Sequence, residues 1–268
     1  MPPKGEPPPL PAALPVEVFD SHCHLDAMGV DVGQSLVDAA AVGVTRVVTV
    51  GDTLESSRWC ADTAAKHPSV VAAVAVHPNE VGDLDESTWD GLAELAARPE
   101  VRAVGETGLD YYWGRVPADV QQEAFRRHIA LAKAHGKALV IHDRDAHADV
   151  LRVLREEGAP EWTVFHCFSG DAEMAQECVR AGYVLSFAGT VTFTNAPSLR
   201  EAAAVTPLDR LLVETDAPFL TPVPYRGRPN APYLVPLTVR ALAAVKSVHI
   251  EQLCEAVTHT GQRVFGDW

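Results

Sequence analysis

Two histidines one residue apart stand in the stretch Phe19-Asp20-Ser21-His22-Cys23-His24. This stretch continues a short apolar run that predicts a strand, and alternate side chains of a strand point to the same face. His22 and His24 can therefore direct their imidazoles toward one point. Two neutral imidazoles on one face are half of a site for a borderline divalent metal. Because a bare His-x-His pair also occurs on surfaces that bind no metal, this interpretation needs further ligands elsewhere in the chain.

Four more candidate ligands each follow an apolar run: Glu106, His142, His166 and Asp216. A glutamate behind an apolar strand is costly to bury unless it is paired, protonated or metal-bound. A single histidine in such a position is more often a structural core residue, and Asp216 alone could cap the turn before Pro218. Taken together, four histidines and two carboxylates at strand ends favour a metal site.

This set exceeds what one tetrahedral ion needs, and a carboxylate can bridge two ions about 3.5–4 Å apart. The sequence therefore predicts a binuclear site for two divalent metal ions. Coordination lowers the pKa of water toward about 7, which makes the water a strong nucleophile at neutral pH. The predicted reaction class is metal-assisted hydrolysis.

The elements that must position these residues alternate between short β-branched runs and longer runs rich in alanine and leucine, a pattern typical of βα units. Eight strands are predicted, at 16–20, 44–51, 70–77, 102–106, 137–142, 163–166, 183–189 and 211–216. Their carboxyl ends lie roughly 23 to 36 residues apart, which leaves room for one helix each and for no second domain. A doubly wound sheet is also built from βα units, so the alternation alone does not distinguish the two folds. The count of eight and the chemistry at the strand ends favour an α/β fold of the (β/α)8 TIM-barrel class, in which those ends share one mouth.

The predicted domain covers residues 16–268, after a proline-rich stretch at 1–15 that we expect to be a disordered tail outside the fold. A helix is predicted over Gln121–His135, ended by Gly136. Its histidines, His128 and His135, do not end a strand, so they are interpreted as solvated helix residues.

The net charge of −14 argues against a general nucleic-acid-binding module, which would show a basic surface. An enzyme that meets phosphate through bound cations and a few arginines remains compatible with that charge. Five cysteines without CxxC spacing indicate neither a disulfide framework nor a thiolate zinc site. The sequence has no apolar run of membrane-spanning length and no signal-peptide pattern, so a cytoplasmic protein is expected.

The motifs, taken together, closely resemble the TatD-like deoxyribonuclease family of the metal-dependent hydrolase superfamily: DSHCHLD, VHP, GETGLDYY, HDRDA, FHCFSG, ETDAPFL and PYRGRPNAP, in this order. The resemblance implies a TIM barrel with two divalent cations, of the Mg, Zn or Mn class, that cleaves DNA phosphodiesters, in relatives often as a 3′-to-5′ exonuclease. It implies that His22 and His24 bind the first metal and that His142 and His166 bind the second. Glu106 would be the catalytic carboxylate that bridges them, and Asp216 the catalytic aspartate beside the attacking water.

Candidate substrate contacts lie outside this set. His77 ends the third predicted strand and could touch a phosphate, although a structural role is equally compatible. Arg226 stands between prolines and could grip a phosphate. Tyr111, Tyr112 and Trp113 follow Glu106 and could stack on a base or form ordinary rim packing. The expected substrate is DNA, at single-stranded ends, with no membrane and no obligate protein partner.

Two alternatives stay open on the sequence. A small-molecule amidohydrolase or deaminase could use the same binuclear site, and the acidic net charge favours it slightly. A scaffold barrel without catalysis is the other, although a complete set of six ligands argues against it. The candidate phosphate and base contacts favour the phosphodiesterase.

Overall fold

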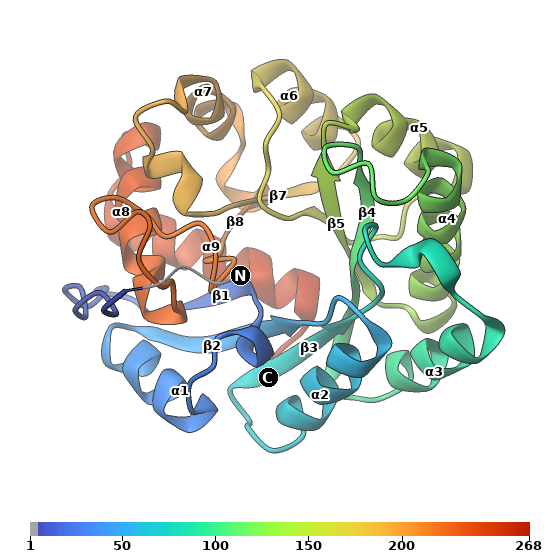
Figure 1. Cartoon of the computed structure of the whole chain (residues 1–268). Helices are drawn as coiled ribbons and strands as arrows, with labels where there is room; N and C mark the ends of the chain where they lie inside the picture. The colour runs from blue at the N-terminus through green and yellow to red at the C-terminus, as the bar shows by residue number, and fades with distance from the viewer. Residues whose placement is uncertain (1–4) are drawn as a thin grey trace. The chain divides into compact units, whose positions relative to one another are not determined.

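Eight β-strands alternate with helices in the computed structural model of the chain, which describes residues 5–268 (Figure 1). They form one sheet in the order β1 to β8, and the ladders β3–β4, β4–β5, β5–β6 and β7–β8 are parallel. The strands are β1 Val18–Cys23, β2 Val44–Val50, β3 Val70–Val74, β4 Val101–Asp110, β5 Ala138–Arg144, β6 Thr163–Phe165, β7 Val184–Phe187 and β8 Leu211–Val213. A parallel bridge joins Cys23 of β1 to Ala217, just after β8. The first and last strands therefore meet, as the predicted (β/α)8 class requires.

The α-helices are α1 Val32–Ala41, α2 Leu54–Ala64, α3 Glu86–Ala96, α4 Ala118–His135, α5 His147–Glu157, α6 Ala172–Arg180, α7 Pro197–Val205, α8 Val235–Lys246 and α9 Ile250–Phe265. Short 3-10 turns are η1 Leu25–Ala27, η2 Val81–Asp83, η3 Gly189–Thr192, η4 Leu208–Arg210 and η5 Pro232–Leu234. As predicted, α4 ends at Gly136, which adopts the left-handed conformation with φ 60°. No single described helix is long and apolar enough to cross a membrane. Pro232–Lys246 and Ile250–Phe265 pass that test of length and composition only as a pair bent by 111°.

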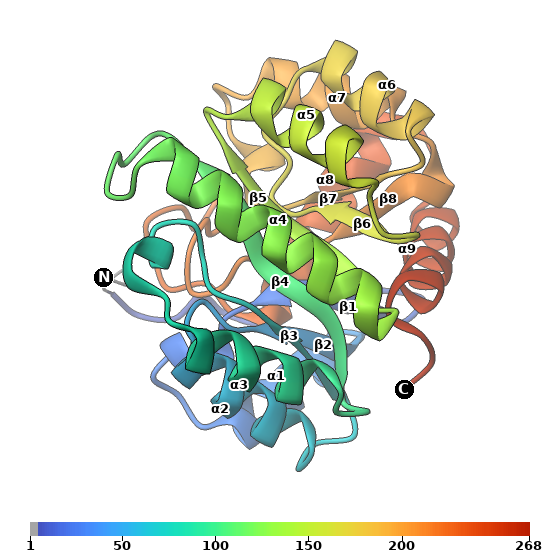
Figure 2. The ribbon, with the colours of Figure 1, turned by 90° about the vertical axis from the view of Figure 1, so that its right-hand side faces the viewer.

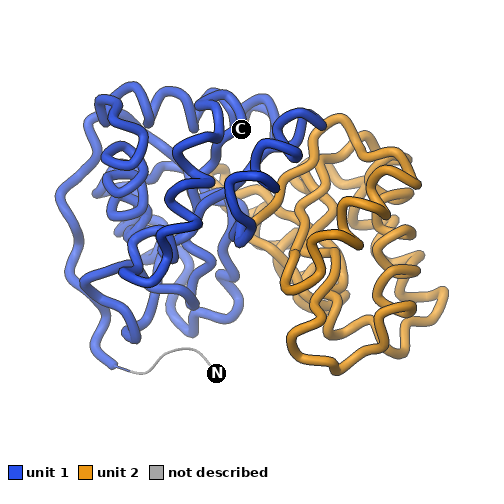
Figure 3. Tube along the Cα trace, turned by 90° about the horizontal axis from the view of Figure 1, so that it is seen from above, with its two compact units in different colours: residues 1–48, 167–267 blue, residues 49–166, 268 orange. Residues whose placement is uncertain are grey.

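Two compact units make up the chain, the first from residues 1–48 and 167–267 and the second from residues 49–166 and 268 (Figure 3). In the first unit, α9 packs against β1, β8 and α8. The ring of Phe19 meets the ring of Phe265 edge-on at 6.3 Å. Gly261 of α9 leaves the space that the Phe19 ring occupies, because a Cβ there would lie 1.6 Å from Cζ of Phe19. The expectation of a single domain stays a prediction.

In the second unit, α4 lies along β4 (Figure 2). Its core includes Trp89, Leu92 and Ala124. The strand β4 runs to Asp110, whereas the sequence predicted its end at Glu106, so Glu106 lies inside the strand. Gly108, at φ 133°, lets β4 continue its pairing with β5, because a Cβ there would lie 2.1 Å from the carbonyl oxygen of His142.

The proline-rich stretch differs from the predicted unpacked tail. Its carbonyl groups accept hydrogen bonds from side chains of the first unit: Arg228 donates to Glu6 at 2.8 Å and to Pro7 at 2.9 Å, and the Tyr233 hydroxyl donates to Pro8 at 2.8 Å. Proline lacks an N–H but keeps its carbonyl acceptor, so a proline-rich segment can be held in this way. Residues 5–15 are thus part of the first unit, and residues 1–4 of the predicted tail lie outside the described residues.

Candidate metal centre

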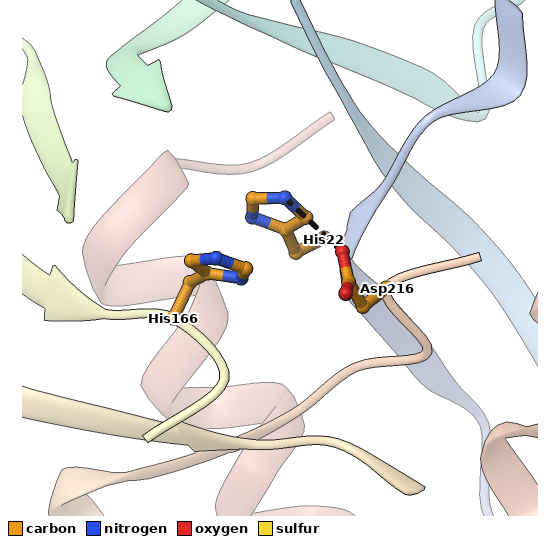
Figure 4. A group of neighbouring side chains, drawn as sticks. All are labelled: His22, His166 and Asp216. Atoms are coloured by element: carbon orange, nitrogen blue, oxygen red, sulfur yellow. Dashed lines mark ion pairs between the residues drawn. The ribbon is translucent and has the colours of Figure 1, made fainter. Parts of the chain in front are cut away.

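The first unit gathers three of the predicted ligands. The Nε2 atoms of His22 and His24 lie 3.4 Å apart, so the two imidazoles share a face as the strand alternation predicted. Oδ1 of Asp216 lies 3.8 Å from Nε2 of His22, the ion pair dashed in Figure 4, and 3.5 Å from Nε2 of His24. All three side chains are largely buried. We call these three residues the first ligand group.

Backbone contacts between β1 and the segment after β8 hold this group. The Asp216 N–H donates to the carbonyl of His22 at 2.9 Å, and the His24 N–H donates to Ala217 at 2.7 Å. The fully buried Asp20 accepts from the N–H of Thr215 at 2.9 Å and from its hydroxyl. Burial raises the pKa of the Asp20 carboxyl to about 8, in spite of these hydrogen bonds. The segment that carries Asp216 is thereby fixed to β1, which carries His22, and to His24 directly after it.

The spacing of the first ligand group fits a metal ion. Ligand atoms about 2.0–2.2 Å from a tetrahedral ion lie roughly 3.4 Å from one another. The three distances of 3.4, 3.5 and 3.8 Å are close to that value. Two imidazoles and a carboxylate are also ligand types that zinc and related divalent metals accept.

The second unit gathers three histidines around the carboxylate of Glu106. Its Oε1 lies 2.6 Å from Nδ1 of His142, 2.8 Å from Nε2 of His166 and 3.6 Å from Nε2 of His77. One ligand atom each from His77, Glu106 and His142 lie within 4.8 Å of one another, which suits a shared ion. We call these four residues, His77, Glu106, His142 and His166, the second ligand group.

Two small residues of the GETGLDYY motif allow this close approach. A Cβ at Gly105 would lie 2.6 Å from Cβ of Val140, and Gly108 leaves no room for a side chain beside His142. The backbone of β4 can therefore lie directly against β5. This contact places Glu106 and His142 within hydrogen-bonding distance although they are 36 positions apart.

Burial and neighbouring charges shift the pKa values of residues in the second ligand group. Burial alone would raise the pKa of the Glu106 carboxyl, but the charges of His166 and His77 and hydrogen bonds from His142 and His166 hold that pKa well below its usual range. Burial also lowers the pKa of His77 to about 4. For His142, burial acts to lower the pKa, and hydrogen bonds to Asp110 and Glu106 outweigh it and raise that pKa. Glu106 is thus an ionised, buried carboxylate, ready to accept a cation.

Sequence reasoning missed Asp110, at the end of β4. Its Oδ2 lies 3.1 Å from Nε2 of His142 and accepts a hydrogen bond from the Asn79 side chain at 3.0 Å. Burial opposes the charge of Asp110, but the hydrogen bond from His142 outweighs it, and the pKa falls to about 2. A carboxylate on the second nitrogen of a metal-binding histidine orients the ring and makes it a better ligand. The signal available in the sequence was the place of Asp110 in the same motif as Glu106.

The predicted substrate contacts take different places. The Tyr111 hydroxyl donates a hydrogen bond to the Asp149 carboxylate at 2.9 Å and accepts one from the Gln122 side chain at 2.8 Å. Tyr112 is 55% exposed. His77, predicted as a substrate contact, belongs to the second ligand group. The exposed Arg226 lies over the ring of Phe193, with Cζ 4.3 Å from the ring centroid.

Comparisons with known proteins find a matching family model, similar sequences and a similar fold. A family model described as TatD related DNase matches residues 19–266. The chain is 51% identical to an uncharacterized metal-dependent hydrolase TatD of Mycobacterium tuberculosis, over 93% of this chain and 98% of that protein. It is 41% identical to the uncharacterized metal-dependent hydrolase YcfH of Escherichia coli K12, over 92% and 95%. The crystal structure of YjjV, a TatD homologue from Escherichia coli K12, superposes with a TM-score of 0.90 at 27% identity, over 94% and 98% of the two chains.

Proposed function

This chain belongs to the family of TatD-related DNases, metal-dependent hydrolases with a (β/α)8 barrel, and we propose that it hydrolyses phosphodiester bonds of DNA. Metal-dependent hydrolysis follows from the family. The curated relatives are themselves uncharacterized, so the substrate has to be argued from this chain. The finer proposal is a deoxyribonuclease that removes nucleotides from single-stranded 3′ ends.

The observation that carries the substrate proposal is a cationic, aromatic loop directly after Asp110. Tyr112 and Trp113 are 55% and 52% exposed, and their rings meet edge-on at 5.0 Å. The guanidinium of Arg144 lies over the Tyr112 ring at 3.8 Å, and that of Arg115 lies 5.3 Å from the Trp113 centroid. Exposed aromatic rings beside arginines suit unpaired bases and their phosphates, since every base offers a flat face for stacking.

Asp110 connects this loop to the second ligand group. Its Oδ1 accepts hydrogen bonds from the N–H groups of Tyr112 at 3.0 Å and Trp113 at 3.3 Å, while its Oδ2 faces His142. One buried carboxylate therefore fixes both the aromatic loop and a candidate metal ligand. A base stacked on this loop would have its phosphate close to that ligand, which supports a polynucleotide rather than a small amide.

For the chemistry, we propose the metal assignment that the sequence predicted, because the carboxyl ends of barrel strands serve one active site. His22, His24 and Asp216 would hold one ion, His142 and His166 a second, and Glu106 both. His77 would be a further ligand of the second ion, because it forms a possible metal-binding group with Glu106 and His142. Two bound divalent cations would lower the pKa of water and neutralise phosphate charge. Asp216 would accept a proton from the attacking water at a carboxylate oxygen, and Arg226 would bind phosphate.

A nuclease assay tests the proposal. Purified protein, stripped of metal and reconstituted in turn with Mg²⁺, Mn²⁺ or Zn²⁺, is given DNA labelled at either end, single- or double-stranded, beside a panel of amides. Stepwise shortening from the 3′ end of single strands is the expected result. Turnover of an amide with intact DNA would support the amidohydrolase alternative, and no metal bound with no turnover would support a scaffold.

Two variants at Tyr112 test the loop within the same assay. Tyr112→Ala removes the ring that Arg144 covers, whereas Tyr112→Phe keeps the ring and loses only the hydroxyl. We expect KM for single-stranded DNA to rise for the alanine variant and to stay near the wild-type value for the phenylalanine variant. Equal KM values for all three proteins would show that the loop does not take part in substrate binding.

The cytoplasmic location and the lack of an obligate protein partner stay predictions.

A further inference from the structure

His128 lies in the middle of α4, where the sequence predicted a solvated residue, but its side chain is fully buried in the second unit. Its Nε2 lies 3.2 Å from the backbone nitrogen of Val76, and its Nδ1 lies 2.9 Å from the hydroxyl oxygen of Thr107. The ring packs on Trp89, with the centroids 4.8 Å apart. A helix residue is thus bound at once to the segment after β3 and to β4.

These contacts fix the state of the imidazole. The backbone N–H of Val76 can only donate, so Nε2 of His128 accepts and carries no proton. The ring proton therefore sits on Nδ1, which donates to Thr107 Oγ1. Burial favours the neutral ring and lowers the pKa of His128 to about 3. His128 is thus a neutral ring whose Nε2 accepts from the segment after β3 and whose Nδ1 faces Thr107 of β4. The ring also makes a backbone hydrogen bond with Ala124 of its own helix.

Both contacts are next to members of the second ligand group. Val76 directly precedes His77, and Thr107 directly follows Glu106. The β3–β4 ladder has its last pair at Val74 and Val104, so the strand pairing has ended where these residues stand. Beyond that point, the imidazole of His128 connects the two segments through its contacts with Val76 and Thr107.

We propose that His128 is a positioning residue that sets the separation of His77 and Glu106, and so the metal affinity of the second ligand group. His77 Nε2 and Glu106 Oε1 are 3.6 Å apart. Without His128, the segment 75–77 would lose a hydrogen bond that fixes it relative to β4. Substitution of a residue that supports the metal ligands, without itself binding the metal, commonly lowers metal affinity 10–100-fold. This proposal rests on the proposed metal-binding role of the second ligand group.

The first test measures cobalt binding to metal-free protein by the visible absorption of Co²⁺, together with a thermal melt. His128→Leu removes both hydrogen bonds and keeps an apolar filling, and Thr107→Val removes only the hydroxyl acceptor. We expect Co²⁺ affinity to fall about 10–100-fold for His128→Leu and by less for Thr107→Val. His128→Gln offers an amide oxygen to Val76 and an amide N–H to Thr107, so it should restore most of the affinity.

The matched control is the neighbouring residue of the same helix. Ile129 is buried as deeply as His128 and is apolar, so Ile129→Ala disturbs the packing of α4 without touching either hydrogen bond. We expect it to lower the melting temperature and to leave Co²⁺ affinity unchanged. Equal losses of affinity in Ile129→Ala and His128→Leu would overturn the proposal, because the effect would then be one of packing.

Unchanged Co²⁺ affinity in folded His128→Leu would also overturn it. If that variant does not fold, Thr107→Val and His128→Gln decide, and wild-type affinity for Thr107→Val would overturn the proposal. Failure of the wild-type protein to bind Co²⁺ is a separate outcome. It would contradict the proposed metal-dependent function itself.

Discussion

The two ligand groups use the same residue types but are held in different ways. In the first group, backbone hydrogen bonds between β1 and the segment after β8 set the positions, and the ligand atoms stand 3.4 to 3.8 Å apart. In the second group, side chains bind one another: Glu106 lies within 2.8 Å of His142 and His166, and Asp110 holds the far side of His142. The first group is spaced by the main chain, and the second by its own hydrogen bonds.

This difference has a physical consequence. Backbone hydrogen bonds survive a change of one side chain, so a substitution in the first ligand group should alter the chemistry and leave the remaining ligands in place. In the second group each side chain is also a partner of the next, so the loss of one leaves a buried polar group without its hydrogen bond. Four predictions test whether the two ligand groups differ in this way, beginning with the largest expected effect.

Removal of metal should affect both groups and has the largest expected effect. Prolonged chelation should abolish hydrolysis, because the proposed nucleophilic water needs a bound cation to lower its pKa. Adding a divalent ion back should restore activity. Turnover and metal content are measured on the same sample before and after chelation. Full activity in protein shown to be free of metal would contradict the proposed mechanism.

Asp216→Asn tests the first ligand group. Asp216 has φ 56°, a conformation that asparagine also tolerates, so the backbone should be preserved. Turnover should fall by about 10²- to 10⁴-fold through loss of the proton acceptor, with DNA binding nearly unchanged. Single-turnover rate and melting temperature are measured on the same variant. A lower melting temperature with normal turnover of the folded fraction would assign Asp216 a purely structural role.

Asp110→Asn tests the second ligand group through a residue outside the predicted ligand set. Loss of the carboxylate that orients His142 should weaken metal binding about 10–100-fold, measured by titration of metal-free protein. His147→Gln is the matched control, since His147 also pairs with a carboxylate, Asp143, at 2.7 Å but outside the two ligand groups. A control that weakened metal binding as much as Asp110→Asn would show that neither pair has a specific role.

His128 should make the stability of the metal-free protein depend on pH, the smallest of the four effects. Its pKa is about 3 in the folded chain and about 6.5 when unfolded, so below pH 6.5 only the unfolded chain takes up the proton. Stability should therefore fall with decreasing pH, by at most about 1.4 kcal/mol per pH unit. His128→Gln lacks this contribution. Urea unfolding of both proteins between pH 7.5 and 5 measures it, and parallel curves would refute it.

Local patterns in the sequence were sufficient for much of the fold. The alternation of β-branched and helical runs predicted eight strands, and all eight are present among the described residues. His22 and His24 share a face because strand geometry has a period of two, and α4 ends at Gly136 because glycine adopts the left-handed conformation at low cost. Each of these features depends on residues close together in the chain.

The tertiary structure alone decided which distant groups meet. Asp110 lies 32 positions before His142, and Val76 lies 52 positions before His128, so no local pattern could pair them. The burial of His128 followed from the strand segments that α4 covers, since its own helix pattern only placed it on a face. Carbonyl groups of the proline-rich segment accept hydrogen bonds from side chains more than 220 positions away, such as that of Arg228. A sequence specifies the direction of a side chain through local geometry, whereas its partner depends on packing of the whole unit.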